Sequence, residues 1–298
     1  MKNTVAHPGK EQRTPFQIRF SDIVIGIDPS DAPVGLPPEL SKLMITEPMT
    51  ADAEYRIVLL EQPLPEDTAP VYQYSGTTVY RTPEGWLRIH PLCRGKDGCQ
   101  VACLLRPSGK NILYYPAAHW DQYASPLHCA HLMGLETVLL NRNAFLLHSS
   151  VVMLEGKAVL FSGPSGAGKS TQARLWQEHL GAELLNGDRC VIMQRPDGFY
   201  GGGSPLAGSS NIYRPEQAPI AGIFLLEKGP ENRVQRLGFT ALAPLLSQTL
   251  INSWDTDFMD KLTTLYQQLL STVPIYRLTC RLDADAVTLA YKTAFSPD

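Results

Sequence analysis

One segment of the sequence has the residue types and the spacing of a phosphate-binding loop. Residues 163–170 read Gly-Pro-Ser-Gly-Ala-Gly-Lys-Ser and match G-x-x-x-x-G-K-[ST] at every fixed position. Glycines let the backbone curl so that successive N–H groups face a phosphate, and a following helix presents its positive N-terminal end to the same anion. An apolar run at 158–162 precedes the loop, and a helix-forming run through about His179 follows it. The segment is predicted to bind a nucleotide; the alternative is a glycine-rich turn that binds nothing.

The pattern assigns a role to each part of this loop. The ammonium group of Lys169 is expected to reach the β- and γ-phosphates, and the hydroxyl of Ser170 to be a ligand of Mg²⁺. ATP is the expected phosphoryl donor, with another donor left open. The residues expected to contact the nucleotide are Gly163, Pro164, Ser165, Gly166, Ala167, Gly168, Lys169, Ser170 and Thr171.

The element before the loop departs from the common arrangement of phosphate-loop proteins. Two apolar runs, 145–153 and 158–163, are joined by the short turn 155–157. This turn has no room for a crossover helix, so the two strands must be antiparallel. The sequence also has no LSGGQ segment and no N-K-x-D segment, which argues against ABC-type and guanine-specific proteins.

With these features, residues 146–171 and 181–193 resemble the C-terminal kinase domain of bacterial HPr kinase/phosphorylase and its relatives. These relatives include serine kinases encoded with lasso peptides, and their fold is related to that of phosphoenolpyruvate carboxykinases. The resemblance implies a phosphate-loop domain with a mixed sheet and flanking helices. It also implies transfer of a phosphoryl group to serine. The N-terminal half does not match the corresponding part of HPr kinase.

The resemblance also implies catalytic residues. In the family a strand bearing His is followed by a short turn, a strand, the loop, a helix and two acidic residues. His148 takes the first position here, as a phosphate or acceptor contact, and Asp188 takes the second acidic position, near the metal. Gly187 stands at the first acidic position, which in the family supplies the general base. Either Asp188 does both jobs or another group is the base. The expected catalytic residues are Asp188, Lys169 and His148, and the expected metal ligands are Ser170 and Asp188.

Two further candidates come from the residues downstream. The glycine-rich stretch 201–210 is interpreted as a substrate loop, and Arg214 behind it as a second positive charge on the nucleotide; an ordinary surface connection is the alternative. Glu227 ends the apolar run 222–227 in the manner of a Walker B acid. In an NTPase such a carboxylate would orient a water molecule, whereas the resemblance implies that this strand is mainly structural. The E-x-R-G segment tied to phosphorylase activity is absent, which favours a plain kinase.

The elements that must position these residues indicate a mixed α/β (α+β) fold in two domains. Residues 1–15 are predicted to be a mobile tail, 16–122 a mostly antiparallel β domain, and 123–298 the kinase domain. Within the first domain, hairpins are expected at 77–92 and 100–115, after strands within 16–27 and 53–60. The remaining predicted elements are a helix at 126–143, strands at 184–186, 189–193 and 220–228, helices at 240–251 and 257–270, a strand at 275–280 and a helix from Asp283.

Composition sets the class of protein. The chain has 298 residues, 44% of them hydrophobic, and a net charge of −3, which is normal for a globular protein and predicts no nucleic-acid partner. It has neither an apolar run long enough to cross a membrane nor an N-terminal secretion signal. Six cysteines are too sparse for a disulfide scaffold, so a cytoplasmic location is expected. A homo-oligomer is left open.

Taken together, the sequence predicts an ATP- and Mg²⁺-dependent kinase that phosphorylates a hydroxyl group of serine in a peptide or protein. A kinase acting on a small molecule, such as an amino acid, sugar or nucleoside, is the first alternative. The second is a nucleotide-binding switch or hydrolase without a phosphorylated acceptor. The β domain is expected to recruit or orient the acceptor.

Overall fold

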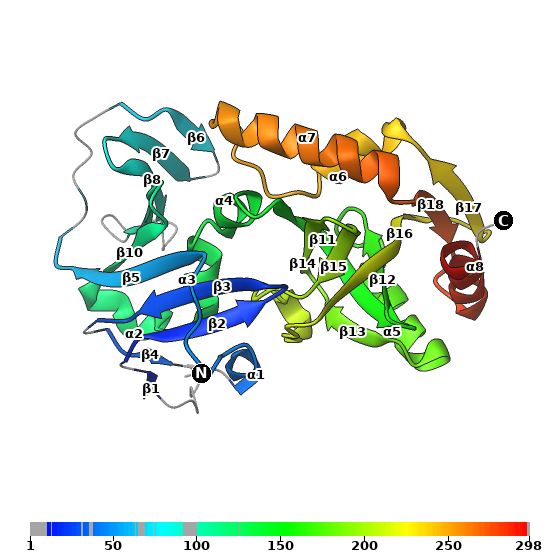
Figure 1. Cartoon of the computed structure of the whole chain (residues 1–298), viewed down its shortest axis with the longest axis horizontal. Helices are drawn as coiled ribbons and strands as arrows, with labels where there is room; N and C mark the ends of the chain where they lie inside the picture. The colour runs from blue at the N-terminus through cyan, green and yellow to red at the C-terminus, as the bar shows by residue number, and fades with distance from the viewer. Residues whose placement is uncertain are drawn as a thin grey trace, which may run out of the picture. The chain divides into compact units, whose positions relative to one another are not determined.

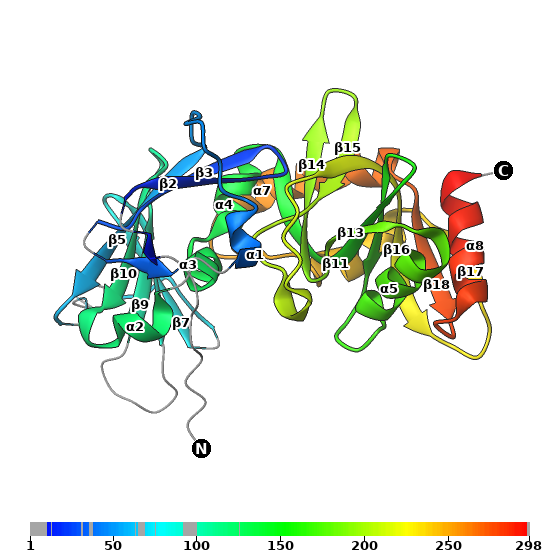
Figure 2. The same cartoon turned by 90° about the horizontal axis from the view of Figure 1, so that it is seen from below.

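Two structural units divide the chain, each with its own β-sheet (Figures 1 and 2). In this computed structural model the described residues are 11–296, except 13, 31, 36–37, 63, 65–68, 75, 92–99 and 125. Unit 1 comprises Met1–Arg19 and Ile23–Val138, and unit 2 comprises Phe20–Asp22 and Leu139–Asp298. Unit 1 therefore extends beyond residue 122, where the sequence predicted the domain boundary. The fold class is mixed α/β, as predicted.

The strands of unit 1 form one eight-stranded sheet in the order β2-β3-β5-β10-β9-β8-β7-β6, with β1 and β4 paired separately. Its strands are β1 (Glu11–Gln12), β2 (Phe16–Phe20), β3 (Ile23–Asp28), β4 (Val34–Gly35), β5 (Ala53–Leu60), β6 (Tyr72–Tyr74), β7 (Thr77–Thr82), β8 (Gly85–Pro91), β9 (Gln100–Leu105) and β10 (Lys110–Pro116). Its helical segments are α1 (Pro38–Ser41), η1 (Ala117–His119), α2 (Trp120–Tyr123), α3 (Pro126–Leu132) and the greater part of α4 (Leu135–Leu140).

Both predicted hairpins, β7–β8 and β9–β10, are confirmed as antiparallel pairs. The domain is mostly antiparallel, as predicted, but at the centre of the sheet β5 runs parallel to both β3 and β10. Parallel neighbours need long connections, and the segments that return the chain to these strands are long enough to supply them. The predicted tail is also shorter than expected, because β1 belongs to it and pairs with β4. Residues 1–10 and 13 of the predicted tail lie outside the described residues.

The single helix predicted at 126–143 is two short helices, α3 and α4, separated at Gly134. This glycine has φ +60°, in the left-handed region. A Cβ there would lie 2.6 Å from Arg88 Nη1 and 2.8 Å from Leu105 Cδ1. The apolar spacing was correct for both helices, but the close approach of β8 and β9 requires a break that only glycine permits.

Unit 2 is built on a second mixed sheet in the order β12-β11-β14-β15-β16-β18-β17, with β13 paired to β11. Its strands are β11 (Ala144–Leu154), β12 (Lys157–Ser162), β13 (Glu183–Asn186), β14 (Arg189–Arg195), β15 (Gly198–Gly202), β16 (Gln217–Lys228), β17 (Arg233–Leu237) and β18 (Ile275–Cys280). Its helices are α5 (Lys169–Leu180), η2 (Gly208–Ser210), η3 (Phe239–Ala241), α6 (Leu242–Leu246), α7 (Thr256–Thr272) and α8 (Ala284–Phe295). Among the described helices none is long and apolar enough to span a membrane.

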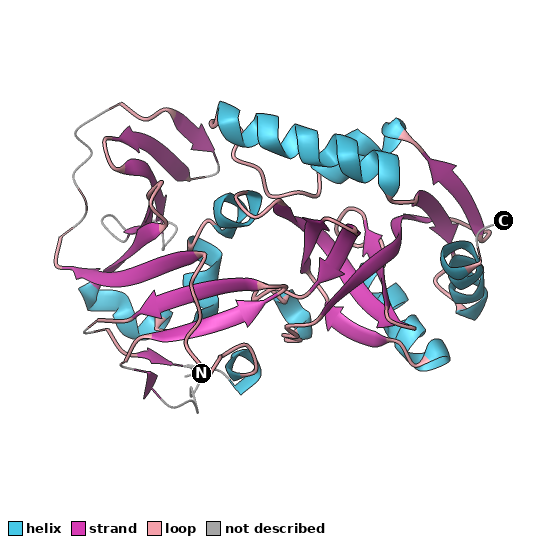
Figure 3. Ribbon diagram, viewed as in Figure 1, coloured by secondary structure: helices cyan, strands magenta, loops and turns pink. Residues whose placement is uncertain are grey.

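Helices lie on both faces of this sheet (Figure 3), and each face has its own hydrophobic core beneath them. One contains Leu147, Leu160 and Leu225 and is covered by α6 and α7. The other contains Phe161 and Leu226 and is covered by α5 and α8. Because β16 pairs with both β15 and β12, the strands β12, β11, β14, β15 and β16 also form a closed circuit of pairings. Consecutive residues of β16 alternate between the two cores, so this alternation decides which residue at the end of β16 faces the site.

Most of the predicted elements of unit 2 are confirmed, including α7, β18 and α8, whose N-cap Asp283 accepts a hydrogen bond from Ala286 N. The helix predicted at 240–251 is wrong beyond Leu246. There the backbone pairs with β11 instead: His148 N donates to Gln248 O at 2.7 Å, and Leu250 N donates to Leu146 O at 3.2 Å. Tertiary pairing with a strand thus overrides the helical spacing of this segment.

Candidate phosphate-binding site

The loop at 163–168 leaves the end of a β-hairpin, as predicted. β11 and β12 pair antiparallel from Leu154 opposite Lys157 to Ser149 opposite Ser162. On its other side β12 pairs in parallel with β16, so the carboxyl ends of β12 and β16 lie at the same edge of the sheet. The loop therefore begins beside the end of β16, and α5 begins directly after the loop.

Glycine is required at both ends of this loop by conformation and by space. Gly163 has φ +145°, and a Cβ there would lie 3.2 Å from the backbone oxygen of Leu226 in β16. Gly168, the N-cap of α5, has φ +106°, and a Cβ would lie 2.5 Å from Leu282 Cδ1. Side-chained residues avoid these φ values. The fixed glycines of the sequence pattern thus maintain a bend that a larger residue would disrupt.

Lys169 is the first residue of α5, and its side chain folds back over the loop. Its Nζ donates to the backbone oxygens of Gly163 at 2.8 Å and Pro164 at 3.1 Å, and the residue is buried. Burial lowers the pKa of this ammonium group, and the nearby carboxylate of Asp188 acts in the opposite direction. The cation is thus held at the centre of the loop.

The first turn of α5 supplies donors next to this cation. The first intrahelical bond runs from Gln172 N to Gly168 O at 2.8 Å, so the N–H groups of Lys169, Ser170 and Thr171 have no partner within the helix. A cavity of about 320 Å³ opens at this point. Its lining residues are His148, Ser165, Gly166, Gly168, Lys169, Ser170, Thr171, Gly187, Asp188, Ser209, Lys228 and Leu282.

Asp188 and His148 meet in this cavity. His148 Nδ1 lies 3.0 Å from Oδ1 of Asp188 and 3.0 Å from its backbone oxygen. Both side chains are partly exposed, at 24% for His148 and 32% for Asp188. The hydrogen bond from His148, with the positive charges of Arg189 and Lys169, holds the pKa of Asp188 below its usual value. The structure therefore brings together Lys169, His148 and Asp188, the three residues predicted to be catalytic.

A buried asparagine, not identified from the sequence, fixes the position of Asp188. Asn186 Oδ1 accepts hydrogen bonds from the backbone N–H groups of Asp188 at 2.8 Å and Arg189 at 2.9 Å. Asn186 Nδ2 donates in turn to the backbone oxygens of Ser204 and Leu206. The sequence signal was the polar Asn at the end of an apolar strand, two residues before the acid. This network ties Asp188 to the glycine-rich stretch.

That stretch does reach the site, as its composition suggested. A Cβ at Gly208 would lie 2.8 Å from Cγ of Asp188, and Ser209 lines the cavity. Arg214, by contrast, does not line the cavity. Its guanidinium group pairs with Glu183 at 2.8 Å. Glu183 is the first residue of β13, and the site lies after its last residue, Asn186. At ~3.3 Å per residue these two ends of the strand are about 10 Å apart.

The positive charge predicted for Arg214 comes instead from Lys228, which lines the cavity. Lys228 shares a strand face with Leu226, whose side chain packs in the core under α5. Glu227 lies on the opposite face, where its Oε2 accepts from Thr279 Oγ1 at 3.3 Å and lies 3.9 Å from Arg277 Nε. The carboxylate of Glu227 therefore points away from the phosphate loop, and it is Lys228 that faces the loop. Glu227 does not take the position of a Walker B acid.

Gly187 has no room for the acidic side chain that the resembling family carries there. A Cβ at this position would lie 2.7 Å from both Cβ and Oγ of Ser210. Ser210 is itself held, because its Oγ donates to Ala207 O at 2.6 Å and accepts from Ile212 N at 3.3 Å. This turn therefore carries one carboxylate, that of Asp188.

We expect Gly187→Asp to lower the free energy of unfolding by about 1–3 kcal/mol, because the new side chain overpacks against Ser210. Urea denaturation would measure this penalty in three backgrounds. It should persist with Ser210→Ala, which keeps the Cβ, and fall by at least about half with Ser210→Gly, which removes it. Equal penalties in all three backgrounds would show that Ser210 is not what excludes the acid.

The residues present fit a polyphosphate with a divalent cation. Lys169 and Lys228 are positive, and the first turn of α5 offers N–H groups. At Gly166 no atom lies within 4 Å of the position a Cβ would take, so the loop is open there. Ser170 and Asp188 offer the hydroxyl and carboxylate oxygens that Mg²⁺ prefers. Among the described residues no cluster of three or more His, Cys, Asp or Glu side chains is positioned to hold a metal alone. A cation here would take its further ligands from phosphate oxygens or water.

Comparison with solved structures gives partial likenesses, including one to a kinase/phosphatase. The structure of the Hpr(Ser) kinase/phosphatase from Coxiella burnetii is similar to part of this chain, with 14% sequence identity and a TM-score of 0.28. The match covers 49% of this chain and 94% of that one. No family model and no curated protein matches the sequence.

Proposed function

We propose that this protein is an ATP- and Mg²⁺-dependent kinase that transfers the γ-phosphoryl group to a hydroxyl group, and that the acceptor is a serine of a peptide or protein. The observation that carries the proposal is the convergence of Lys169 and the His148–Asp188 pair on one cavity at the start of α5. A plain anion site would need the cation and the helix terminus alone. The added carboxylate–imidazole pair suits proton removal from an attacking hydroxyl.

The residues of the chain divide the work as follows. Lys169 and the N–H groups at the start of α5 would bind the phosphates and neutralise their charge. Ser170 and Asp188 would hold Mg²⁺, which when bound supplies further charge neutralisation of the phosphoryl group. Asp188 would accept the proton of the acceptor hydroxyl directly, or His148 would do so with its Nδ1–H bonded to Asp188. In either case the hydrogen bond between these two residues orients the base.

Phosphoryl transfer from γ-labelled ATP tests this proposal. The purified protein is incubated with Mg²⁺, labelled ATP and a cell extract, and the products are separated into protein, peptide, small-molecule and free-phosphate fractions. We expect label on a peptide or protein, at serine, and no transfer without Mg²⁺. Label on a small molecule would move the assignment to a small-molecule kinase. Label found only as free phosphate would contradict transfer and favour a nucleotide hydrolase or switch.

A further inference from the structure

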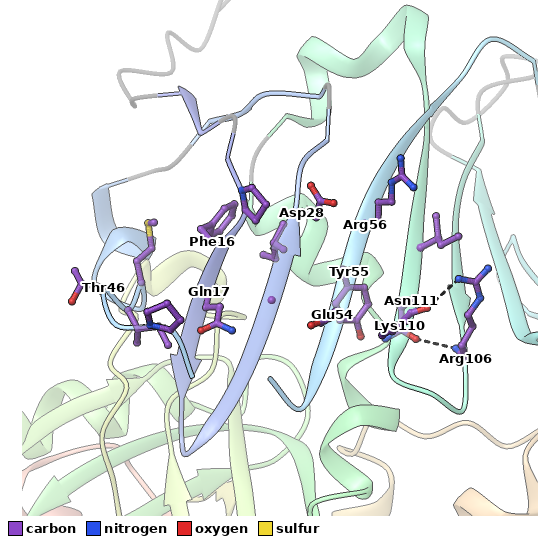
Figure 4. A pocket seen from close by; sticks show the side chains of 17 residues that line it. Phe16, Gln17, Asp28, Thr46, Glu54, Tyr55, Arg56, Arg106, Lys110 and Asn111 are labelled. Atoms are coloured by element: carbon purple, nitrogen blue, oxygen red, sulfur yellow. Dashed lines mark hydrogen bonds between the residues drawn. The ribbon is translucent and has the colours of Figure 1, made fainter. Parts of the chain in front are cut away.

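A second and larger cavity, of about 900 Å³, lies within unit 1 on one face of its sheet (Figure 4). Its floor is formed by β3, β5 and β10, and its two sides by β2 with the segment 44–48 and by the β9–β10 hairpin. The opposite face of the same strands is buried, as Ile25, Ile57 and Leu113 show. The exposed face is thus a groove on a sheet whose other face is already packed.

The register of the strands sets two rows of side chains across this floor. Glu54 of β5 lies opposite Gly26 of β3 and Lys110 of β10. The next row places Arg56 between Asp28 and Ile112. Glu54, Arg56 and Lys110 are exposed. Gly26 adds no side chain, so the floor of the groove is low at that position of β3.

The two sides of the groove differ in chemistry. On the β2 side, Phe16, Met44, Ile45 and Pro48 provide an apolar wall. Gln17 fixes this wall, because its amide group both donates to Met49 O and accepts from Met49 N at 2.8 Å. Figure 4 shows Phe16, Gln17 and Thr46 on this side.

The opposite side is basic. Arg106 and Lys110 lie on this side, and Arg56 stands on the neighbouring floor strand β5, nearer Asp28 (Figure 4). Arg106 pairs with Glu84, and Arg56 Nε donates to Ser30 Oγ at 3.1 Å. Within the described part of the chain, the ammonium group of Lys110 has no hydrogen bond or ion pair. This side therefore has positive charge available for a ligand, beside the carboxylates of Glu54 and Asp28, which also line the groove.

The distance between the two sides selects the kind of ligand. β2 and β10 are separated by three strand intervals, β2-β3-β5-β10, or about 14 Å at ~4.8 Å per interval. A ligand that contacts both walls must therefore be about as long as four residues of extended chain. A ligand shorter than this would reach only one wall.

We infer that this groove binds an extended peptide segment that carries an acidic side chain beside apolar ones. The apolar residues would pack on the Phe16–Met44 side, and the carboxylate would pair with Lys110 and Arg56. The groove is the docking site of the peptide or protein acceptor, an assignment that rests on the proposed function.

Selection from a random library of 12-residue peptides displayed on phage tests this inference on the full chain. Peptides that enrich are synthesised with a fluorophore, and their Kd values are measured by anisotropy. We expect Asp or Glu beside apolar residues in the enriched sequences. The double variant Arg56→Glu/Lys110→Glu should weaken their binding by at least about tenfold, since each reversal places like charges together.

A matched variant, Lys42→Glu/Arg81→Glu, makes the same change of charge on exposed residues of unit 1 that do not line the groove. It should leave the Kd unchanged within about twofold. The inference is overturned if no peptide enriches, if the enriched peptides lack an acidic residue, or if both double variants affect binding equally. ATP binding by the same variants should be unchanged, so failure of docking is distinguishable from failure of the kinase proposal.

Discussion

Replacing Lys169 with Ala should abolish phosphoryl transfer, a fall of at least about 10³-fold, and weaken ATP binding by at least about tenfold. The reason is positional as well as electrostatic. The Lys169 ammonium group bonds to the backbone oxygens of Gly163 and Pro164, so it is fixed at the centre of the loop before any phosphate arrives. Its loss removes both the charge that faces the phosphates and the group that joins the two sides of the bend. Isothermal titration with MgATP and a transfer assay would measure the two effects.

The matched control is Lys261→Ala, which removes an exposed lysine from α7 in the same unit. It should leave both quantities unchanged. Because Lys169 is buried, thermal unfolding of the Lys169→Ala variant must accompany the assay, and Lys169→Met, which keeps most of the buried stem, separates loss of charge from loss of packing. Normal turnover by a folded Lys169→Met variant would remove the loop from the mechanism.

The sequence was sufficient to predict the parts of this site that depend on neighbouring residues. The glycines of the loop, the antiparallel hairpin before it and the helix after it all follow from short-range rules on turns and connections. Asp188 and His148 were identified through a resemblance, and the structure places them within hydrogen-bonding distance. Local pattern was therefore enough for the loop and for the strand and helix that adjoin it.

The sequence was insufficient where strand direction or long-range packing decides. The acidic residue of Glu227-Lys228 was singled out, although alternation along β16 points the lysine to the loop. Nothing local fixes which of two adjacent residues faces α5, because this depends on the register of β16 against β12. Arg214 was misplaced for a related reason: its partner Glu183 comes from another strand. In unit 1 the parallel centre of the sheet depends equally on long connections.

Replacing Asp188 with Asn should lower transfer by at least about 10²-fold while changing ATP affinity by less than about tenfold. Asn keeps the shape of the side chain and an oxygen that accepts from His148 Nδ1, now 3.0 Å from Oδ1. The backbone bond from Asp188 N to Asn186 Oδ1 is also unaffected by the change. What is lost is the negative charge, so the effect should fall on the chemical step and not on nucleotide binding. Asp197→Asn, in the exposed turn between β14 and β15, is the matched control and should transfer normally.

The dependence of transfer on Mg²⁺ then separates the two roles that Asp188 has in the proposed mechanism. If its carboxylate holds the metal, Asp188→Asn should raise the concentration of Mg²⁺ that gives half-maximal transfer, because one charged oxygen ligand is lost. If it acts only as the base, that concentration stays the same and the maximal rate alone falls. Full transfer at ordinary Mg²⁺ concentrations would exclude both roles. Position 187 is glycine and has no space for an acidic side chain beside Ser210. In that case no second carboxylate at this turn could account for the remaining activity.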